Sequence, residues 1–435
     1  MSDNKLSTDS YKGVRDFYPE DMAIQRYIFQ TWSKTAESFG FERYDASILE
    51  PSALYKAKGA ENEEMVNEQT YTFIDRGDRE VTLRPEMTPT VARMVAGQRH
   101  ELTFPLRWYS IPNLFRYERP QRGRLREHWQ LNCDMFGAEH AAADVEMIAL
   151  AHKVLTDFGA TPDMFEIKLN NRQVYSETLL HLAKSNDEEI TNVQINAVIR
   201  HSDRIGKISP EEFTQGLVDI VGEKVASAIV DFIHNQGISD LPIPSRDKLI
   251  SVAEGLSELG IKNVSLEPTL ARGFDYYTGT IFEIFDTSDE NNRALLGGGR
   301  YDNLTGMFGG EAIPGIGFGM GDVTMRDFLE THKLIPEYIR TTAPQVMVIP
   351  METEQNLYAE GVAMKIRQAG HKVATDIGTR KVGKKIGSAS DRGVQFVIVI
   401  GDEEMQNGNL TVKNLLTGEE QSGRIGKLMN FLDTK

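Results

Sequence analysis

The chain has 435 residues, of which 40% are hydrophobic and 26% are charged, and its net charge at pH 7 is −16. This length exceeds one ordinary domain and suits two or three, each with an apolar core. The sequence lacks the apolar run of a secretion signal and any stretch of about 18 apolar residues for a membrane span, and its lone Cys133 excludes an intrachain disulfide. We therefore expect a cytoplasmic protein without a membrane partner.

Charge is unevenly distributed along the chain. Residues 340–435 hold 13 Lys and Arg against 11 Asp and Glu, a net charge of +2, which leaves −18 for the rest. Binding to nucleic acid needs only a local basic patch. The overall acidity therefore weakens that class of function without excluding it.

The first part of the chain predicts helices, short strands and one long hairpin. Residues 20–40 have the amphipathic period of a helix, and strand-like runs alternate with turns over residues 41–106. Residues 106–137 predict an antiparallel hairpin whose tip is the charged loop from Glu118 to Arg126. A second helix is expected over residues 144–158.

The middle of the chain changes from helices to strands. Residues 172–238 show helical periodicity without strand alternation. Strands resume over residues 264–285, and the glycine-rich segment 297–302 predicts a turn. Alternate glycines in 315–321 predict a strand that precedes a helix over 322–331, and close packing explains this alternation as well as a ligand does.

Beyond a linker at residues 332–343, strands and helices alternate as in a compact α/β domain. The expected elements are strands at 345–350, 371–377 and 395–401, and helices at 354–369 and 381–392. The predicted segments are a core (1–169), a helical insertion (170–244), a second part of the core (245–331), the linker and the α/β domain (344–435).

The most informative stretch runs from Leu270 to Ile284. It places Arg272 and two consecutive tyrosines, Tyr276 and Tyr277, on a glycine-bounded turn that leads into a strand. An arginine offers a permanent charge and a planar set of donors for phosphate or carboxylate, and tyrosines offer flat apolar walls with a polar tip. By composition alone, a Tyr-rich strand with a surface arginine is an equally good interpretation.

Two further groups of polar residues can each share one face of a strand. Gln130, Asn132 and Asp134 are two residues apart, as are Glu86 and Thr88 if their segment is extended. A solvated strand face is the alternative. Against that alternative, the strand that carries Gln130 lies among apolar strands and follows an arginine-rich loop. Residues 116–127 contain five arginines and two glutamates, a local charge of +3 that suits a triphosphate, an RNA backbone or both.

Four segments resemble a known family. Residues 270–284 resemble the histidine-specific motif of histidyl-tRNA synthetases, residues 115–124 resemble motif 2 of class II synthetases in its histidyl form, and residues 12–17 resemble the family's opening. The C-terminal module resembles the anticodon-binding domain of the histidyl, threonyl, prolyl and glycyl enzymes. The resemblance implies an α+β class II catalytic domain, with a mainly antiparallel sheet flanked by helices, a helical insertion and a C-terminal α/β anticodon-binding domain, in a homodimer.

The resemblance also implies an activity. The enzyme would activate L-histidine with ATP and Mg²⁺ and pass it to tRNA(His), with no side chain assigned to the metal. Arg116 and Arg272 would grip the α-phosphate, and Arg124 and His128 would also bind ATP. Histidine would be bound by Glu86, Thr88, Gln130, Asp134, Tyr276, Tyr277 and Tyr301. The tRNA would be bound by Gln121, Arg122, Lys381, Lys384, Lys385 and Arg392, and a solvated helix face is the alternative for the last four.

Four residues depart from the family pattern, and one of them, Ser47, stands where motif 1 commonly has Pro, which bears on the dimer interface. Asp134 stands where bacterial members carry Glu, His128 stands where Phe is usual, and Thr324 stands where motif 3 has the arginine that covers adenine. We expect an arginine of the basic loop, Arg124 or Arg126, to cover a base that rests on a neutral His128.

Two alternatives stay open at the level of the sequence. One is a non-catalytic, histidine-sensing regulatory subunit of ATP phosphoribosyltransferase, which shares the catalytic fold but typically lacks the anticodon module and the Arg272 motif. The other is a class II synthetase for another amino acid, against which Asp134 and the paired tyrosines argue.

Overall fold

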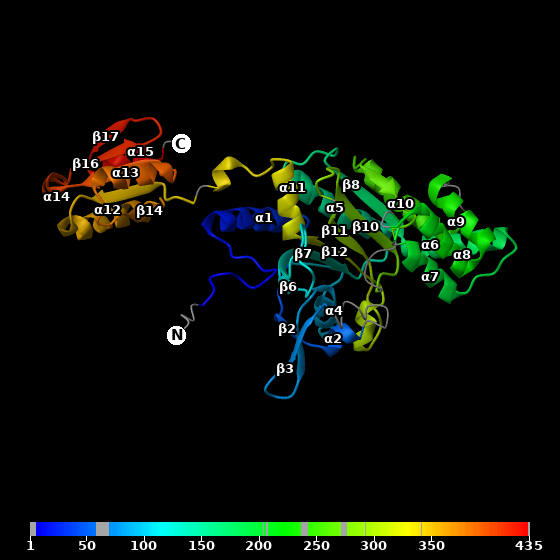
Figure 1. Cartoon of the computed structure of the whole chain (residues 1–435). Helices are drawn as coiled ribbons and strands as arrows, with labels where there is room; N and C mark the ends of the chain where they lie inside the picture. Colours follow the sequence, from blue (N-terminus) through cyan, green and yellow to red (C-terminus); the bar gives the residue numbers. More distant parts are fainter. Residues whose placement is uncertain are drawn as a thin grey trace, which may run out of the picture. The chain divides into compact units, whose positions relative to one another are not determined.

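The computed structural model describes residues 6–57, 69–202, 204–205, 208–235, 242–270, 276–291, 293–340 and 342–433 (Figure 1). The chain forms two compact units. One comprises Gln25–Ile335 with the N-terminal segment up to Asp16, and the other comprises Pro336–Lys435 with Phe17–Ile24. None of the helices among the described residues has the length and hydrophobicity that a bilayer span requires.

The larger unit is built on a mixed, mainly antiparallel sheet, with nine strands in the described part of the chain. They are β1 (Glu42–Arg43), β5 (Leu106–Ser110), β6 (Asn113–Phe115), β7 (Glu127–Phe136), β8 (Phe165–Asn171), β9 (Val264–Leu266), β10 (Thr280–Asp286), β11 (Ala294–Arg300) and β12 (Gly315–Gly321). The order is β1-β5-β7-β12-β11-β10-β8-β9, with β6 beside β7. Only the edge pairs β1–β5 and β8–β9 are parallel among these strands.

The predicted hairpin is confirmed, because β6 and β7 pair antiparallel with Phe115 opposite Glu127. Helices cover one face of the sheet: α5 packs on β7 and β12, and α10 packs on α5 and β8 (Figure 1). Leu131 and Cys133 of β7 point to this face and are fully buried. Helices α5 (Ala141–Asp157) and α10 (Pro244–Glu258) cover this face, and α11 (Asp322–Thr331) packs on β7 and β11. The first helix of the chain is α1 (Pro19–Ser38).

The turn predicted at residues 297–302 is wrong, since its glycines belong to the central strand β11. A β-carbon on Gly298 would lie 2.5 Å from Cζ of Phe282 and 2.6 Å from the carbonyl oxygen of Gly317. The neighbouring strands therefore approach so closely that only glycine fits at this position. Close approach of another backbone is a common reason for glycine inside a strand.

A smaller sheet lies beside the large one, and a helix follows it. The sheet has the order β2-β4-β3, and the elements are β2 (Leu49–Pro51), α2 (Ala53–Lys56), β3 (Tyr71–Ile74), β4 (Glu80–Leu83) and α4 (Thr88–Gly97). The prediction of strands and turns alone over residues 41–106 is thus wrong for α4. That helix is only ten residues long and buries Val91, Ala92 and Val95 completely.

The expected helical segment is confirmed within the described residues. It contains α6 (Arg172–Ser185), α7 (Asn192–Ser202), α8 (Pro210–Val221) and α9 (Glu223–Asn235). The Ser209 side chain accepts a bond from the N–H of Glu212, whose carboxylate accepts one from the Ser209 N–H, and this pair fixes the start of α8.

The C-terminal unit has a five-stranded sheet in the order β14-β13-β15-β16-β17. Its strands are β13 (Val346–Pro350), β14 (Val373–Thr375), β15 (Phe396–Ile400), β16 (Leu410–Asn414) and β17 (Glu420–Gly423), and its helices are α12 (Asn356–Gln368), α13 (Val382–Asp391), α14 (Asp402–Asn407) and α15 (Ile425–Leu432). The first three strands are parallel and the last two antiparallel, so the predicted α/β domain is confirmed.

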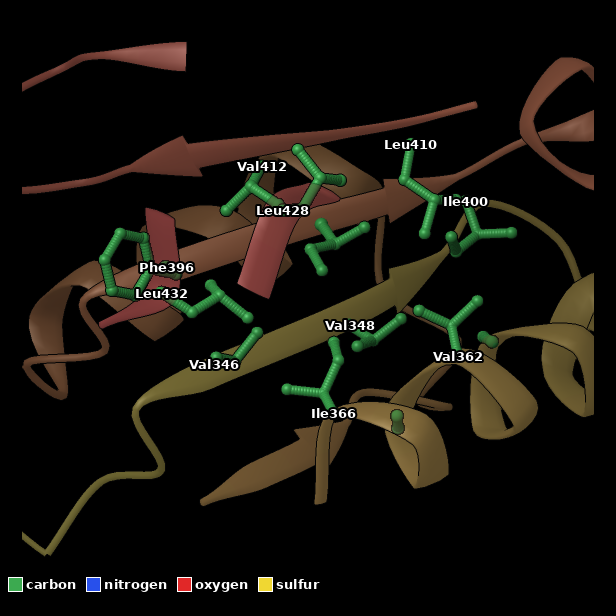
Figure 2. Close-up of a cluster of buried hydrophobic side chains, with 13 residues drawn as sticks. Val346, Val348, Val362, Ile366, Phe396, Ile400, Leu410, Val412, Leu428 and Leu432 are labelled. Atoms are coloured by element: carbon green, nitrogen blue, oxygen red, sulfur yellow. The ribbon is translucent and has the colours of Figure 1, made fainter. Parts of the chain in front are cut away.

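Helices cover both faces of this sheet. Figure 2 shows Val346 and Val348 meeting Ile366 of α12 within one apolar cluster that also contains Leu428 and Leu432 of α15. The alternate residues of β13 pack with Ala389 of α13 in a second cluster. Because both faces are buried, β13 and β15 read as continuous apolar runs.

Candidate active site

The open face of the large sheet owes its shape to alternate glycines on β12. A β-carbon on Gly315 would lie 2.5 Å from the Tyr301 ring, and one on Gly319 would lie 2.5 Å from Nε2 of Gln130. A β-carbon on Gly317 would lie 2.6 Å from a carboxylate oxygen of Asp134. The glycines thus let polar side chains from neighbouring elements lie directly on the backbone of the strand.

Two cavities open on this glycine floor. The larger has a volume of about 610 Å³ and is lined by side chains of the basic loop, β7, β10 and β11 and by the start of α11. The smaller is lined by Glu86, Thr88, Asn132, Tyr276, Tyr277 and Tyr301 among others. Arg116, Gln130, Gly297 and Gly319 line both, so the two cavities form one continuous site.

Arg116 is held in place at the junction of the cavities. Its Nε donates a hydrogen bond of 2.9 Å to the carbonyl oxygen of Pro85, which precedes Glu86. Burial lowers the pKa of this guanidinium below its usual value, although an arginine remains charged at neutral pH. A fixed positive charge therefore faces both cavities.

Three tyrosine rings form the wall of the smaller cavity. The Tyr276 ring lies 5.0 Å from that of Tyr277 and 5.9 Å from that of Tyr301, both edge-on. The Tyr276 hydroxyl donates a bond of 3.0 Å to the buried Glu86 carboxylate. Thr88 begins helix α4, so its segment is not extended as the shared-face argument required, yet both residues line this cavity.

Asp134 lies behind this wall. Its side chain accepts a short hydrogen bond from the Tyr301 hydroxyl, and only 2% of the residue is exposed. Asp134 is not among the described residues that line the smaller cavity, but Tyr301, whose hydroxyl it binds, does line it. Burial raises the pKa of this carboxyl to about 7, partly offset by the bond from Tyr301.

The larger cavity combines cations with a neutral imidazole. Arg124 pairs at 2.5 Å with Glu118, whose side chain is 6% exposed. Burial, with the positive charges of Arg116, Arg15 and Arg124, lowers the pKa of His128 to about 3, so the ring is neutral at physiological pH.

Arg126, the other arginine expected to cover the base, and Arg326 of α11 point elsewhere. The Arg126 guanidinium carbon lies 4.1 Å above the centre of the Tyr117 ring, and its Nε donates to the carbonyl oxygen of Glu118. Arg326 pairs at 3.0 Å with Glu330 on the same helix. Neither is among the described residues that line the cavities.

The remaining predicted residues fall into three groups. Gln121 and Arg122 are exposed at the tip of the basic loop, and Lys381, Lys384 and Arg392 are exposed at α13. Arg272 lies outside the described residues. Lys385 is buried, unlike the other three predicted residues near α13.

Lys385 cannot serve as an exposed phosphate contact. It is 3% exposed, and its Nζ donates to the carbonyl oxygens of Pro350 at 3.1 Å and Asp376 at 2.9 Å. Its ammonium group therefore satisfies two carbonyl groups at the end of the sheet, which a count of lysines on one helix does not reveal.

Sequence reasoning missed two charged residues of the larger cavity, Glu283 and Arg293. Glu283 is the one acid within the apolar run 281–285 of strand β10, and this pattern was the available signal. Arg293 precedes β11 and had no such signal.

Comparison with known proteins agrees with this arrangement. Residues 13–322 match the family model described as histidyl-tRNA synthetase, and residues 345–435 match the model described as anticodon binding domain. The chain belongs to the histidyl-tRNA synthetase family.

A relative of this family, "Histidine--tRNA ligase" of Leptospira biflexa serovar Patoc, is 41% identical over 426 residues, which are 95% of each chain. The crystal structure of the histidyl-tRNA synthetase from Nostoc sp. PCC 7120 is 25% identical, with a TM-score of 0.79 over 98% of this chain and 99% of that one. An "ATP phosphoribosyltransferase regulatory subunit/histidyl-tRNA synthetase" from Bacillus halodurans is 21% identical, with a TM-score of 0.72 over 91% and 98%, and shares the fold.

The first prediction concerns the glycine floor. Gly317→Ala should lower the free energy of unfolding by about 1–3 kcal/mol, because its β-carbon would meet Asp134, the Tyr301 hydroxyl and a backbone oxygen at 2.6 Å. Gly97→Ala is the control, since nothing lies within 4 Å of its β-carbon. Equal denaturation midpoints for Gly317→Ala and the wild type would contradict the packing.

The second prediction concerns the proton on Asp134. Its carboxyl keeps a proton up to about pH 7 in the folded protein but releases it near pH 3.8 when unfolded. The folded state binds more protons in this window, so stability is lost as the pH rises through it. Asp134→Asn cannot titrate, so its unfolding free energy should fall less steeply than that of the wild type between pH 4 and 7. Parallel pH profiles would show that Asp134 is not titrating in this range.

Proposed function

We propose that the protein is a histidine–tRNA ligase, which activates histidine with ATP and transfers it to the 3′ end of tRNA(His). The observation that carries this proposal is the junction of the two cavities at Arg116 and Gln130. Such a junction allows an amino acid in one cavity to react with a nucleotide in the other.

Histidine fits the smaller cavity by its chemistry. Glu86 offers a carboxylate to the α-amino group, with Thr88 and Gln130 as further polar partners. The imidazole lies among Tyr276, Tyr277 and Tyr301. Asp134 holds the Tyr301 hydroxyl, which therefore presents its oxygen as an acceptor to a ring N–H.

Activation occurs at the junction. A carboxylate oxygen of histidine forms a bond to the α-phosphorus of ATP while the bond from that phosphorus to pyrophosphate breaks in line. Negative charge builds on the non-bridging oxygens, where Arg116 is already fixed and needs no reorganisation. From the sequence, we also assign Arg272 to this phosphate. The adenylate then passes histidine to the terminal ribose.

The larger cavity suits ATP with Mg²⁺. Arg124 and His128 line it, together with the carboxylates of Glu118 and Glu283. Mg²⁺ in nucleotide sites is usually bound by one or two carboxylates and the phosphates. Glu283 fits this role, because its Oε1 lies 3.8 Å from the β-carbon position of Gly297 at the junction of the two cavities. The ion would orient and neutralise the pyrophosphate as it leaves.

The tRNA contacts are proposed on exposure and charge. Gln121 and Arg122 at the loop tip would meet the acceptor end, and Lys381, Lys384 and Arg392 the anticodon end. We also propose a homodimer in the cytoplasm, with catalytic segments 1–169 and 245–331, a helical insertion at 170–244, a linker at 332–343 and an anticodon-binding domain at 344–435.

The regulatory-subunit alternative shares the fold, so the fold alone does not decide between them. The match of residues 345–435 to an anticodon binding domain favours the ligase.

The third prediction tests the activity. ATP–pyrophosphate exchange, measured with each of the twenty amino acids, should depend on histidine alone, and purified tRNA(His) should then be charged. Arg116→Ala should slow exchange on the order of 10²–10³-fold, because the charge it meets appears mainly in the transition state. Absence of exchange with every amino acid would favour the regulator, and exchange with another amino acid would overturn the assignment of the smaller cavity.

A further inference from the structure

One end of the larger cavity has a cation to which no role has been given. Among the described residues, three arginines line this cavity: Arg116, Arg124 and Arg293. Arg116 lies at the junction with the smaller cavity, and Arg124 is paired with Glu118 at 2.5 Å. Arg293 directly precedes β11 and lines the larger cavity but not the smaller one.

The rise per residue of strand β11 gives the separation between Arg293 and the junction of the two cavities. Gly297 lines both cavities and marks the junction, and Ala294, the first residue of β11, directly follows Arg293. At about 3.3 Å per residue, the start of β11 is up to about 10 Å from Gly297, and Arg293 precedes it. An ATP whose α-phosphorus is at the junction extends its base and sugar away from the smaller cavity, toward this end.

Arg293 lies beside Thr324, the residue that replaces the expected arginine of motif 3. A β-carbon on Gly123 would lie 2.9 Å from Cδ of Arg293 and 3.3 Å from Cγ2 of Thr324, so both side chains border the same glycine. The Thr324 hydroxyl donates a bond of 3.3 Å to the carbonyl oxygen of Leu295, two residues after Arg293. The two side chains thus approach one point from different elements.

Asn291, two residues before Arg293, contacts three other elements. It donates bonds of 2.6 Å to Asp286 and 3.1 Å to Thr331, and accepts one of 3.0 Å from Arg122 of the basic loop. The Asp286 carboxylate also bonds to His332 at 2.8 Å. These contacts join the end of β10, the end of α11 and the basic loop close to the start of β11.

We propose that Arg293 is the adenine-binding cation of this enzyme, with its guanidinium stacked on the base, in the place that position 324 leaves vacant. This rests on the proposed ATP-dependent function. Thr324 is too short to reach across a base, and its methyl group instead leaves room for a side chain from β11. A planar guanidinium stacks on an aromatic face, which an ammonium group does not match. The neutral His128 ring also lines this cavity and supplies a second flat surface without repelling the cation.

The fourth prediction is that Arg293→Ala raises the KM for ATP in histidine-dependent exchange by roughly 2- to 30-fold, the range of a cation–π contact. The KM for histidine and kcat should be nearly unchanged. Arg293→Lys keeps the positive charge but lacks the planar guanidinium, so its KM for ATP should lie between those of the wild type and Arg293→Ala. Arg326→Ala is the matched control, because Arg326 pairs with Glu330 outside both cavities. An unchanged KM for ATP in a folded Arg293→Ala protein would overturn the proposal.

Adenosine separates a base contact from a phosphate contact. If Arg293 stacks on the base, the dissociation constant of Arg293→Ala for adenosine, measured by calorimetry, should exceed that of the wild type by the same factor as the KM for ATP. A loss of ATP affinity with unchanged adenosine affinity would place Arg293 on the phosphates instead. This binding test does not need catalysis, so it decides the role of Arg293 even if the wild type shows no exchange. Should Arg293→Ala fail to fold, the comparison of Arg293→Lys with the wild type serves instead.

Discussion

The site depends on the direct approach of side chains to the bare backbone of β12. At Gly315, Gly317 and Gly319 a β-carbon would lie 2.5–2.6 Å from a neighbouring atom, a distance that real β-carbons do not adopt. The missing methyl groups make room for Tyr301, Gln130 and the carboxylate behind them on one face, while the other face of the strand is packed with large apolar residues. The strand is thus a floor on one side and part of the core on the other.

Burial also determines which side chains of the site are charged near neutral pH. It lowers the pKa of His128 to about 3 and raises that of Asp134 to about 7, so these groups carry little or partial charge near neutrality. Arg116 keeps its charge because a guanidinium loses its proton only at very high pH. Positive charge therefore persists at the junction of the cavities, where a phosphate and a carboxylate would meet. This arrangement suits a reaction whose charge develops at one point.

The sequence predicted what depends on local pattern and failed where close packing decided. Strand 315–321 and helix 322–331 were placed with the bounds that the structure has, because alternation and a helix start are local signals. The glycines of β11 were taken for a turn, since nothing local tells a turn from a strand crowded by Phe282. Lys385 and Arg293 show the same limit for the site. The burial of Lys385 under carbonyl oxygens, and the approach of Arg293 and Thr324 to the same glycine, arise only in the folded chain.

The central claim is that the two cavities form one site joined at Arg116 and Gln130. A non-hydrolysable histidyl-adenylate analogue, in which a sulfamoyl group replaces the phosphate, tests it by calorimetric titration against histidine and adenosine alone. The account predicts that the analogue binds more tightly than either part and that histidine no longer binds once the analogue is present. An analogue that binds no more tightly than adenosine, with histidine binding unchanged beside it, would contradict a shared junction.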